Sequence, residues 1–402
     1  MPSDLALGGS AHFGVAGDGT LVHASGPVWE PKATLLIGGR TGEPTSLVHE
    51  SRAFLAPAVS PVGRWMCVQV QGATDHLWMY DLERPAAAGT RLTFNADNTC
   101  PVFTADGKRL AFRSNMSGRH EIYWMGVDGS GIGGGGPEIL YSSDRAPAPC
   151  CFADDGKTIV FTQQRAPGGA ATQTHASAAA VASAIEIWYA PVDNPGAARA
   201  LAQSPTSAWG AAVSPDNKFI AYVSDETGRP EVYVQQYSGT SATGGGGARR
   251  QVSAEGGAAP IWSRVGGELF FRAGDQIIGV RIAVEPTFMV GRPRVLFQGP
   301  STPPTHLVRN YDLLPSGDFV VLRGQEETAR VSSLNVTLNW FTELRRRVPV
   351  PQTPTLAGTR MGSSNFVSGG MSGMGTPMPT RAGPAATPAG KPAFPSDAKT
   401  IG

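Results

Sequence analysis

The chain has 402 residues, of which 51 are Gly and 33 are Pro, while only 16% are charged. Gly and Pro interrupt helices and form turns, so this composition favours an all-β fold of many short strands. With 33 basic and 32 acidic residues the formal net charge is +1. This balance excludes a global electrostatic field that would attract nucleic acid or an anionic membrane.

A short turn sequence recurs along the chain between apolar stretches. Successive turns are 44 to 61 residues apart, and they end at Gly19, Gly63, Gly107, Gly156, Asn217, Gly266 and Gly317. Gly and Asn tolerate the left-handed backbone at the end of such a turn, and Pro presets its first position. We therefore expect each of the seven turns to close a hairpin between two strands.

The residues around each turn predict four strands. The clearest repeat has them at residues 101–103, 109–113, 121–125 and 138–141. Residues 209–252 show the same pattern. Tandem four-stranded units of 40 to 50 residues are typical of β-propeller blades, which must stack because one sheet cannot bury both of its faces. We predict an all-β propeller of four-stranded antiparallel blades, seven in number, with six blades and an appended hairpin as the alternative.

The ends of the chain are expected to close the ring. The first unit offers four strands, around Phe13 and residues 21–23, 33–37 and 45–48, and the last offers three, at residues 311–314, 319–322 and 335–340. The seventh sheet would then take an outer strand from residues 5–7. Pairing the two ends removes exposed sheet edges.

The predicted domains are a propeller over residues 1–349 and a tail over residues 350–402. A flexible insert of small residues, 165–184, separates the second and third strands of the fourth unit. From Pro351 onward, 36 of 52 residues are Pro, Gly, Ser, Thr or Ala. Such a segment buries too little apolar surface to offset the entropy of ordering, so we expect disorder. Residues 341–347 are expected to form one or two helical turns.

Compartment signals are few. The four cysteines, Cys67, Cys100, Cys150 and Cys151, show no C-x-x-C spacing, so neither a zinc site nor a disulfide framework is predicted. The N-terminus lacks the basic and apolar regions of a signal peptide, and no apolar run approaches the roughly 20 residues of a membrane span. We expect a cytoplasmic monomer without a membrane span or a cofactor.

Two repeats carry a family resemblance. Residues 221–225 and 231–234, which follow Ser214-Pro215-Asp216, resemble the TolB-type WD40-like repeat, as do residues 91–129. The resemblance extends over about residues 11–345 and implies a propeller. Residues 13–22, 286–297 and 338–344 are similar, more narrowly, to the propeller that follows the kinase domain in bacterial eukaryotic-like serine/threonine kinases. Neither H-R-D nor D-F-G occurs, so we expect no phosphoryl transfer from this chain.

Motifs for other chemistry are also missing. G-x-S-x-G does not occur, and residues 131–136 match G-x-G-x-x-G only within a poly-Gly tract. The seven histidines show no paired spacing for a metal ligand set. The sequence therefore predicts a protein that is not an enzyme. The alternatives are the regulatory or sensor propeller of a longer serine/threonine kinase, and a lyase or hydrolase with a dispersed site in the central channel.

What remains for function is the end of the ring that carries the loops between the second and third strands and between successive blades. We predict that this loop face binds a protein or peptide partner in a scaffold or sensor role. Arginines beside aromatic residues are typical anchors of recognition surfaces. The candidate binding residues on this face are Asp75, His76, Asn95, Asp97, Asn98, Arg119, Arg145, Trp209, Arg229, Arg272, Asp275 and Arg309.

Overall fold

The computed structural model describes residues 13–16, 18–25, 33–38, 44–48, 50–85, 87–127, 135–166, 184–201, 206–237, 239, 249–283, 289–299, 304–305, 307–324 and 333–347. The chain divides into a larger unit, residues 30–328, and a smaller unit from residues 1–29 and 329–402. The predicted tail, the strand near residues 5–7 and residues 167–183 of the predicted insert lie outside the described residues.

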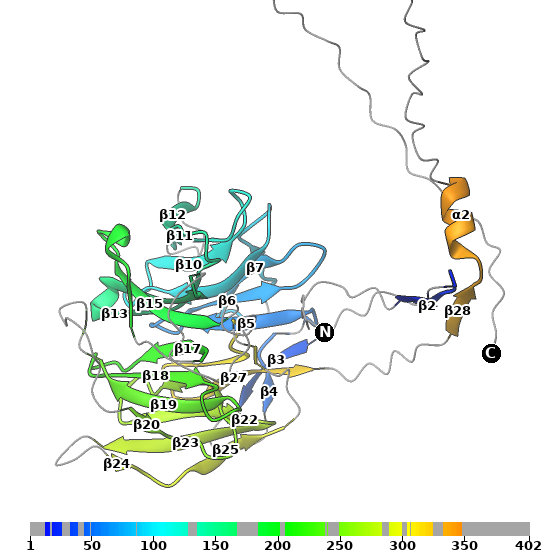
Figure 1. Ribbon diagram of the computed structural model, residues 1–402. Helices are drawn as coiled ribbons and strands as arrows, with labels where there is room; N and C mark the ends of the chain where they lie inside the picture. The colour runs from blue at the N-terminus through cyan, green and yellow to red at the C-terminus, as the bar shows by residue number, and fades with distance from the viewer. Residues whose placement is uncertain are drawn as a thin grey trace, which may run out of the picture. The chain divides into compact units, whose positions relative to one another are not determined.

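Five sheets of the larger unit use strands that follow one another in the chain, and these are blades 1 to 5 (Figure 1). Blade 1 comprises β5 (Phe54–Val59), β6 (Trp65–Val70), β7 (His76–Asp81) and β8 (Thr90–Arg91). Blade 2 comprises β9 (Asn98–Phe103), β10 (Arg109–Ser114), β11 (Glu121–Gly126) and β12 (Glu138–Tyr141). Blade 3 comprises β13 (Ala148–Ala153), β14 (Thr158–Gln164), β15 (Ile185–Pro191) and β16 (Arg199–Ala200).

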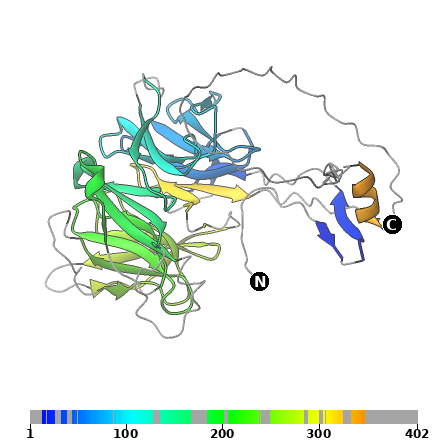
Figure 2. The ribbon, with the colours of Figure 1, turned by 45° about the horizontal axis from the view of Figure 1, so that its top comes forward.

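The next two blades complete the consecutive series. Blade 4 comprises β17 (Ala208–Val213), β18 (Phe219–Ser224), β19 (Glu231–Gln236) and β20 (Arg250–Gln251). Blade 5 comprises β21 (Ala258–Trp262), β22 (Glu268–Ala273), β23 (Gln276–Ala283), β24 (Met289–Val290) and β25 (Arg294–Gln298). The colours from blue through cyan and green to yellow-green follow this order from sheet to sheet (Figure 2). Short one-turn helices lie at Asp154–Gly156 and Pro195–Ala197 in blade 3.

Blade 6 joins strands from the two ends of the larger unit. Its strands are β26 (Tyr311–Leu313), β27 (Phe319–Gly324), β3 (Ala33–Gly38) and β4 (Thr45–Ser46), in that order across the sheet. The antiparallel ladder between β27 and β3 runs from Phe319 opposite Gly38 to Gly324 opposite Ala33. This ladder closes the ring non-covalently, and it places β27 beside β3 in Figure 1.

The described residues therefore form six blades, the alternative of the sequence analysis, and not the favoured seven. β1 (Phe13–Val15) and β2 (Leu21–Ser25) pair with β28 (Ser333–Thr337) in a separate three-stranded sheet. The expected first unit is thus split between two sheets, because its first two strands share a sheet with β28 and its last two share a sheet with β27. The expected last unit is split in the same way. Seven turns overcount the blades because the turn at Gly19 belongs to the separate sheet.

The smaller unit adds one helix to its sheet. β28 runs into α2 (Trp340–Arg347), which the sequence predicted as one or two helical turns (Figure 1). The backbone N–H of Trp340 donates to the Gly19 carbonyl at 2.7 Å, and the Phe341 ring packs against Gly19. None of the helices in the described ranges is long and apolar enough to span a membrane.

The turn chemistry predicted from the sequence is confirmed. Gly107 ends the β9–β10 turn with φ of +68°, and Asn217 ends the β17–β18 turn with φ of +55°. Glycines 19, 63, 156, 266 and 317 likewise have positive φ. These left-handed residues put the first hairpin of every blade at one end of the ring. The loop face lies at the other end, because strands alternate in direction.

Apolar side chains fill the spaces between neighbouring blades. Between blades 2 and 3, Ala111, Ile122, Ile159 and Phe161 are fully buried in one cluster. Fully burying one such aliphatic or aromatic side chain contributes about 1.5–3 kcal/mol. Each blade therefore depends on its neighbours for stability, as the repeat pattern predicted.

Candidate functional site

The innermost strands of the blades are bulged where they surround the central axis. Ala56, Cys100, Gly210 and Ala259 have left-handed backbone at these places, and three of them precede a proline. The ladder shifts register across each bulge. A β-bulge bends its strand and leaves a residue unpaired. All four bulge residues line a cavity of about 60 Å³.

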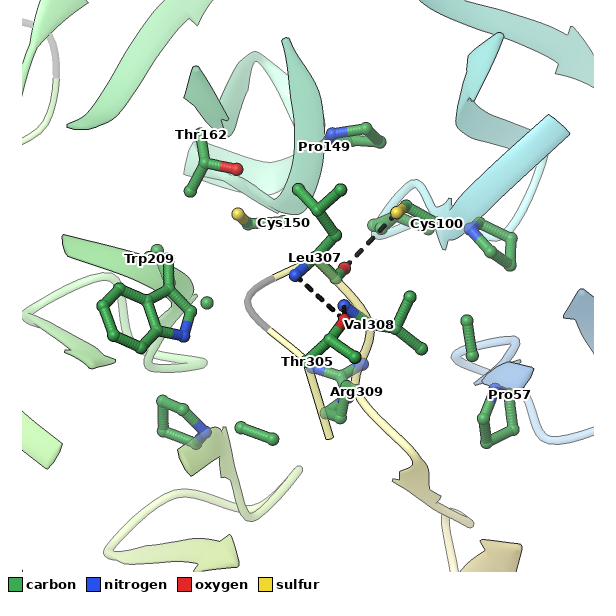
Figure 3. A pocket seen from close by; sticks show the side chains of 17 residues that line it. Pro57, Cys100, Pro149, Cys150, Thr162, Trp209, Thr305, Leu307, Val308 and Arg309 are labelled. Atoms are coloured by element: carbon green, nitrogen blue, oxygen red, sulfur yellow. Dashed lines mark hydrogen bonds between the residues drawn. The ribbon is translucent and has the colours of Figure 1, made fainter. Parts of the chain in front are cut away.

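The cavity walls are mostly apolar, with a few polar atoms. Figure 3 shows Leu307 and Val308, from the segment before β26, between Cys100 on one side and Trp209 on the other. The Cys100 thiol donates to the Leu307 carbonyl at 3.3 Å. Thr305 Oγ1 accepts from the backbone N–H groups of Leu307 and Val308 at 3.3 and 3.0 Å. This segment is therefore held in place by its own side chain and by blade 2.

The two cysteines of the cavity are poor nucleophiles. Burial raises the pKa of the Cys100 thiol, and it raises the pKa of Cys150 to about 11. The reactive form of a cysteine is the thiolate, which these environments disfavour. Within the described ranges, no group of three His, Cys, Asp or Glu side chains is arranged to hold a metal ion.

Several predicted residues meet on the loop face of blades 1 and 2. The Asp75 backbone N–H donates to Asp97 Oδ1 at 3.0 Å, and Gln69 Nε2 donates to Asp75 Oδ2 at 2.7 Å. The Asp97 N–H donates to Asn115 Oδ1 at 2.8 Å, and Asn115 Nδ2 donates to Asp97 Oδ2 at 3.1 Å. Asn98 Nδ2 donates to the carbonyls of residues 95 and 96. The loops β6–β7, β8–β9 and β10–β11 are thereby tied into one surface.

His76 belongs to the same surface. Its Nε2 lies 2.7 Å from Thr74 Oγ1. Burial and then the Arg91 charge lower the His76 pKa, against a smaller opposing effect of Asp97. This histidine is therefore neutral at pH 7, and its ring can both donate and accept a hydrogen bond.

Two predicted arginines have structural partners. Arg119 Nε donates to Glu121 Oε1 at 3.0 Å, and Arg229 Nε donates to Glu231 Oε1 at 2.7 Å. Both glutamates are 1% exposed or less, and both also accept from a serine of the outer strand region. Each arginine thus neutralises a buried carboxylate, which limits what it can offer to a partner.

The other predicted residues are spread over the ring. Arg145 stacks on the Trp188 ring at 4.3 Å, while Trp209 and Arg309 line the cavity. Asp275 is exposed in the β22–β23 turn. Arg272 was expected on the surface but is only 2% exposed, because it shares a face of β22 with Phe270, which packs between blades 5 and 6. The structure therefore gathers Asp75, His76, Asn95, Asp97, Asn98 and Arg119 and leaves the remainder apart.

The sequence reasoning missed two apolar residues of the same surface. Phe94 in the β8–β9 loop is 68% exposed, and Met116 in the β10–β11 loop is 42% exposed. The Arg91 guanidinium lies over the Phe94 ring at 5.2 Å. Their position in predicted loops was the available signal. With Asn95, Asp97 and Arg119 they form what we call the blade 1–2 patch.

The comparisons with known proteins concern the fold. No protein-family model and no curated protein sequence matches this chain. Among solved structures, a protein described as TolB from Agrobacterium tumefaciens is 17% identical with a TM-score of 0.54, covering 73% of this chain and 98% of its own. TolB from Acinetobacter baumannii is 18% identical with a TM-score of 0.47, covering 69% and 66%.

Several enzymes are also among the similar structures. An oligogalacturonate lyase in complex with manganese is 13% identical with a TM-score of 0.44, and it covers 82% of both chains. Identities this low carry information about the fold alone. In its fold, the larger unit of this chain is a six-bladed TolB-like β-propeller.

Proposed function

We propose that this chain is a non-catalytic binding protein, and that the blade 1–2 patch takes a protein or peptide partner. The observation that carries the proposal is the exposure of Phe94 and Met116 on two neighbouring loops. Large apolar side chains surrounded by polar ones mark interaction sites, and aromatic residues and Met are enriched in interfaces.

Pre-organisation of the loops supports the same proposal. The paired hydrogen bonds between Asp97 and Asn115 fix the β8–β9 loop against the β10–β11 loop. Phe94 and Met116 are therefore presented by a rigid frame, and little entropy is lost when a partner binds. The neutral net charge of the chain leaves recognition to these local contacts.

The test is capture of a partner by the purified protein from the cells that make it. The Phe94→Ala/Met116→Ala double variant should retain less than about a tenth of the partner, since truncating an interface anchor costs about 2 kcal/mol or more. The matched control is Val62→Ala/Val265→Ala, which removes exposed apolar side chains at the opposite end of the ring, 74% and 92% exposed.

The two pairs of variants decide the outcome. If both double variants lose partner capture equally, the partner adheres non-specifically. If the Phe94→Ala/Met116→Ala variant captures as much partner as the wild-type protein, the blade 1–2 patch is not the binding site. Thermal unfolding at an unchanged temperature must accompany either result, so that misfolding is not mistaken for lost binding.

We further propose that this propeller is the sensor or regulatory part of a longer serine/threonine kinase. Two of the three stretches with that resemblance, residues 13–22 and 338–344, fall in the smaller unit, and β2 pairs with β28 directly before the second of them. The intact mass of the endogenous protein tests this. A species much larger than 42.0 kDa that contains a kinase domain supports it, and a mass near 42.0 kDa rejects it.

A further inference from the structure

Arg113 in β10 is a half-buried arginine that is attracted by the Asp97 charge but has no hydrogen-bond partner among the described residues. Its guanidinium makes no hydrogen bond or ion pair with any described residue, and its Nε is buried. Burial lowers the pKa of Arg113, but arginine stays charged at any physiological pH. A guanidinium has five N–H donors and no acceptor. A buried Nε–H without an acceptor is costly to the fold.

Two further unpartnered groups belong to the same place. Successive residues of a strand point to opposite faces, so Arg113 shares a face with Ala111, His120 with Ile122, and Gln163 with Phe161. Ala111, Ile122 and Phe161 pack together between blades 2 and 3. Arg113, His120 and Gln163 therefore lie at the loop-face end of that interface, which we call the blade 2–3 junction.

The junction holds two buried donors, Arg113 Nε and Gln163 Nε2, beside His120 Nδ1, which donates in the tautomer that carries its proton there. His120 Nδ1 and Gln163 Nε2 are buried without a hydrogen-bond partner among the described residues, and Gln163 is 2% exposed. Gln163 Oε1 already accepts from Ser143 Oγ at 2.9 Å. The nearby Asp97 carboxylate attracts the Arg113 charge, but its hydrogen bonds come from Asp75 N–H and Asn115 Nδ2. The group that would satisfy the junction is one that only accepts and carries negative charge.

We propose that the blade 2–3 junction binds a carboxylate, held by Arg113 with His120 and Gln163, and that this carboxylate is an acidic or C-terminal group of the protein or peptide partner. The second half rests on the proposed function. A carboxylate matches the planar fork of arginine, and hydrogen bonds between charged groups are about twice as strong as neutral ones. Met116 and Arg119 lie in the loop that ends at His120, so a partner on the blade 1–2 patch passes beside the junction.

The first experiment uses succinate as the probe and the His120 ring as the reporter. Burial and then the charge of Arg113 lower the His120 pKa, against a smaller opposing effect of Asp97. A bound carboxylate favours the imidazolium, so succinate should raise the His120 pKa and shift its NMR signal in a saturable way. The Arg113→Gln variant should weaken succinate binding about tenfold or more.

The matched control is Arg323→Gln. Arg323 in β27 is six residues beyond the turn glycine, as Arg113 is in β10, but it is exposed. The Arg323→Gln variant removes the same charge from the equivalent strand position and leaves the blade 2–3 junction unchanged. Gln163→Leu is the second junction variant, and it too should weaken binding. Saturation that is unchanged in both junction variants, or no saturable shift in the wild-type chain, would overturn the carboxylate site.

Partner capture separates this inference from the proposed function. Loss of capture in Phe94→Ala/Met116→Ala with full capture in Arg113→Gln, although succinate binds, would mean that the site takes a free small acid and not the partner's carboxylate. Failure of succinate binding with loss of capture at the patch would reject the inference and leave the proposed function intact. Reduced capture in Arg113→Gln and not in Arg323→Gln supports both.

Discussion

Two junctions of the propeller occupy equivalent places and differ in chemistry. The blade 2–3 junction contains Arg113, His120 and Gln163. The corresponding positions between blades 4 and 5, counted from the turns at Asn217 and Gly266, are Val223, Pro230 and Ala273. Val223 and Ala273 belong to one apolar cluster.

The comparison shows that the fold does not need polar side chains at this place. Blades 4 and 5 close with apolar ones, and a buried polar group without a partner costs about 1–3 kcal/mol. The polar side chains between blades 2 and 3 therefore destabilise the fold, and packing does not compensate for this. A ligand that accepts hydrogen bonds from these side chains would explain why they are polar.

The largest effect is expected when the polar feature is moved to the apolar junction. Val223→Arg places a charge at a position that is 0% exposed and belongs to an apolar cluster. The free energy of unfolding should fall by about 3 kcal/mol or more, measured by urea denaturation. Val223→Ala is the size control and should cost about 1–2 kcal/mol. If Val223→Arg costs less than Val223→Ala, polar groups at a junction need no functional explanation.

Blade 2 also contains a buried polar group whose hydrogen bonds are satisfied, the Glu121 carboxylate. Glu121 is 1% exposed and accepts hydrogen bonds from Ser117, Ser142 and Arg119. Glu121→Ala removes the carboxylate that accepts from Arg119 Nε and both serines, so the free energy of unfolding should fall by about 2–4 kcal/mol. Glu231→Ala in blade 4, which removes the same kind of acceptor, should cost a similar amount. If the free energy of unfolding falls by less than about 1 kcal/mol in both variants, the hydrogen bonds to these glutamates do not stabilise the fold.

The same glutamate predicts an acid sensitivity. Burial by itself raises the Glu121 pKa, but the hydrogen bonds from Ser117, Ser142, Arg119 and Tyr123 outweigh it and lower the pKa to about 2. The native state thus binds this proton less readily than the unfolded chain, with its ordinary value of 4.5. The contribution is present above pH 4.5 and is lost as the pH falls towards 2. In Glu121→Gln this part of the pH dependence of unfolding should vanish, while a wild-type slope in the variant would contradict the assignment.

The architecture was predictable because its signals are local. Turn glycines and apolar alternation define the hairpins of blade 2 nearly to the residue, since both act between neighbours in the chain. The pairing of β3 with β27 could not be predicted, because it joins residues about 285 apart in the chain and neither strand's sequence indicates its partner. That pairing decides between six and seven blades.

The site was predictable only in part, for a related reason. Loop position placed Asp75, His76 and Asp97 correctly on one face, but it could not show that Arg119 is engaged by Glu121. Arg113 was overlooked because it stands inside an apolar strand, where a charged residue is read as solvent-facing. Its two-residue spacing from Ala111 was the available signal, and it places Arg113 on the face that packs against blade 3.

The smallest expected effect on stability is the most informative for the junction. Arg113→Leu gives the blade 2–3 junction the apolar character of the blade 4–5 junction. Because the guanidinium has no compensating hydrogen-bond partner among the described residues and is only attracted by the Asp97 charge, its removal should leave the free energy of unfolding unchanged or raise it by up to about 1 kcal/mol, measured by urea denaturation at low salt. Arg323→Leu, which removes an exposed charge, should change it by less than about 0.5 kcal/mol. A loss of more than about 2 kcal/mol in Arg113→Leu alone would make Arg113 a structural residue, and the donors of the junction would then need no ligand.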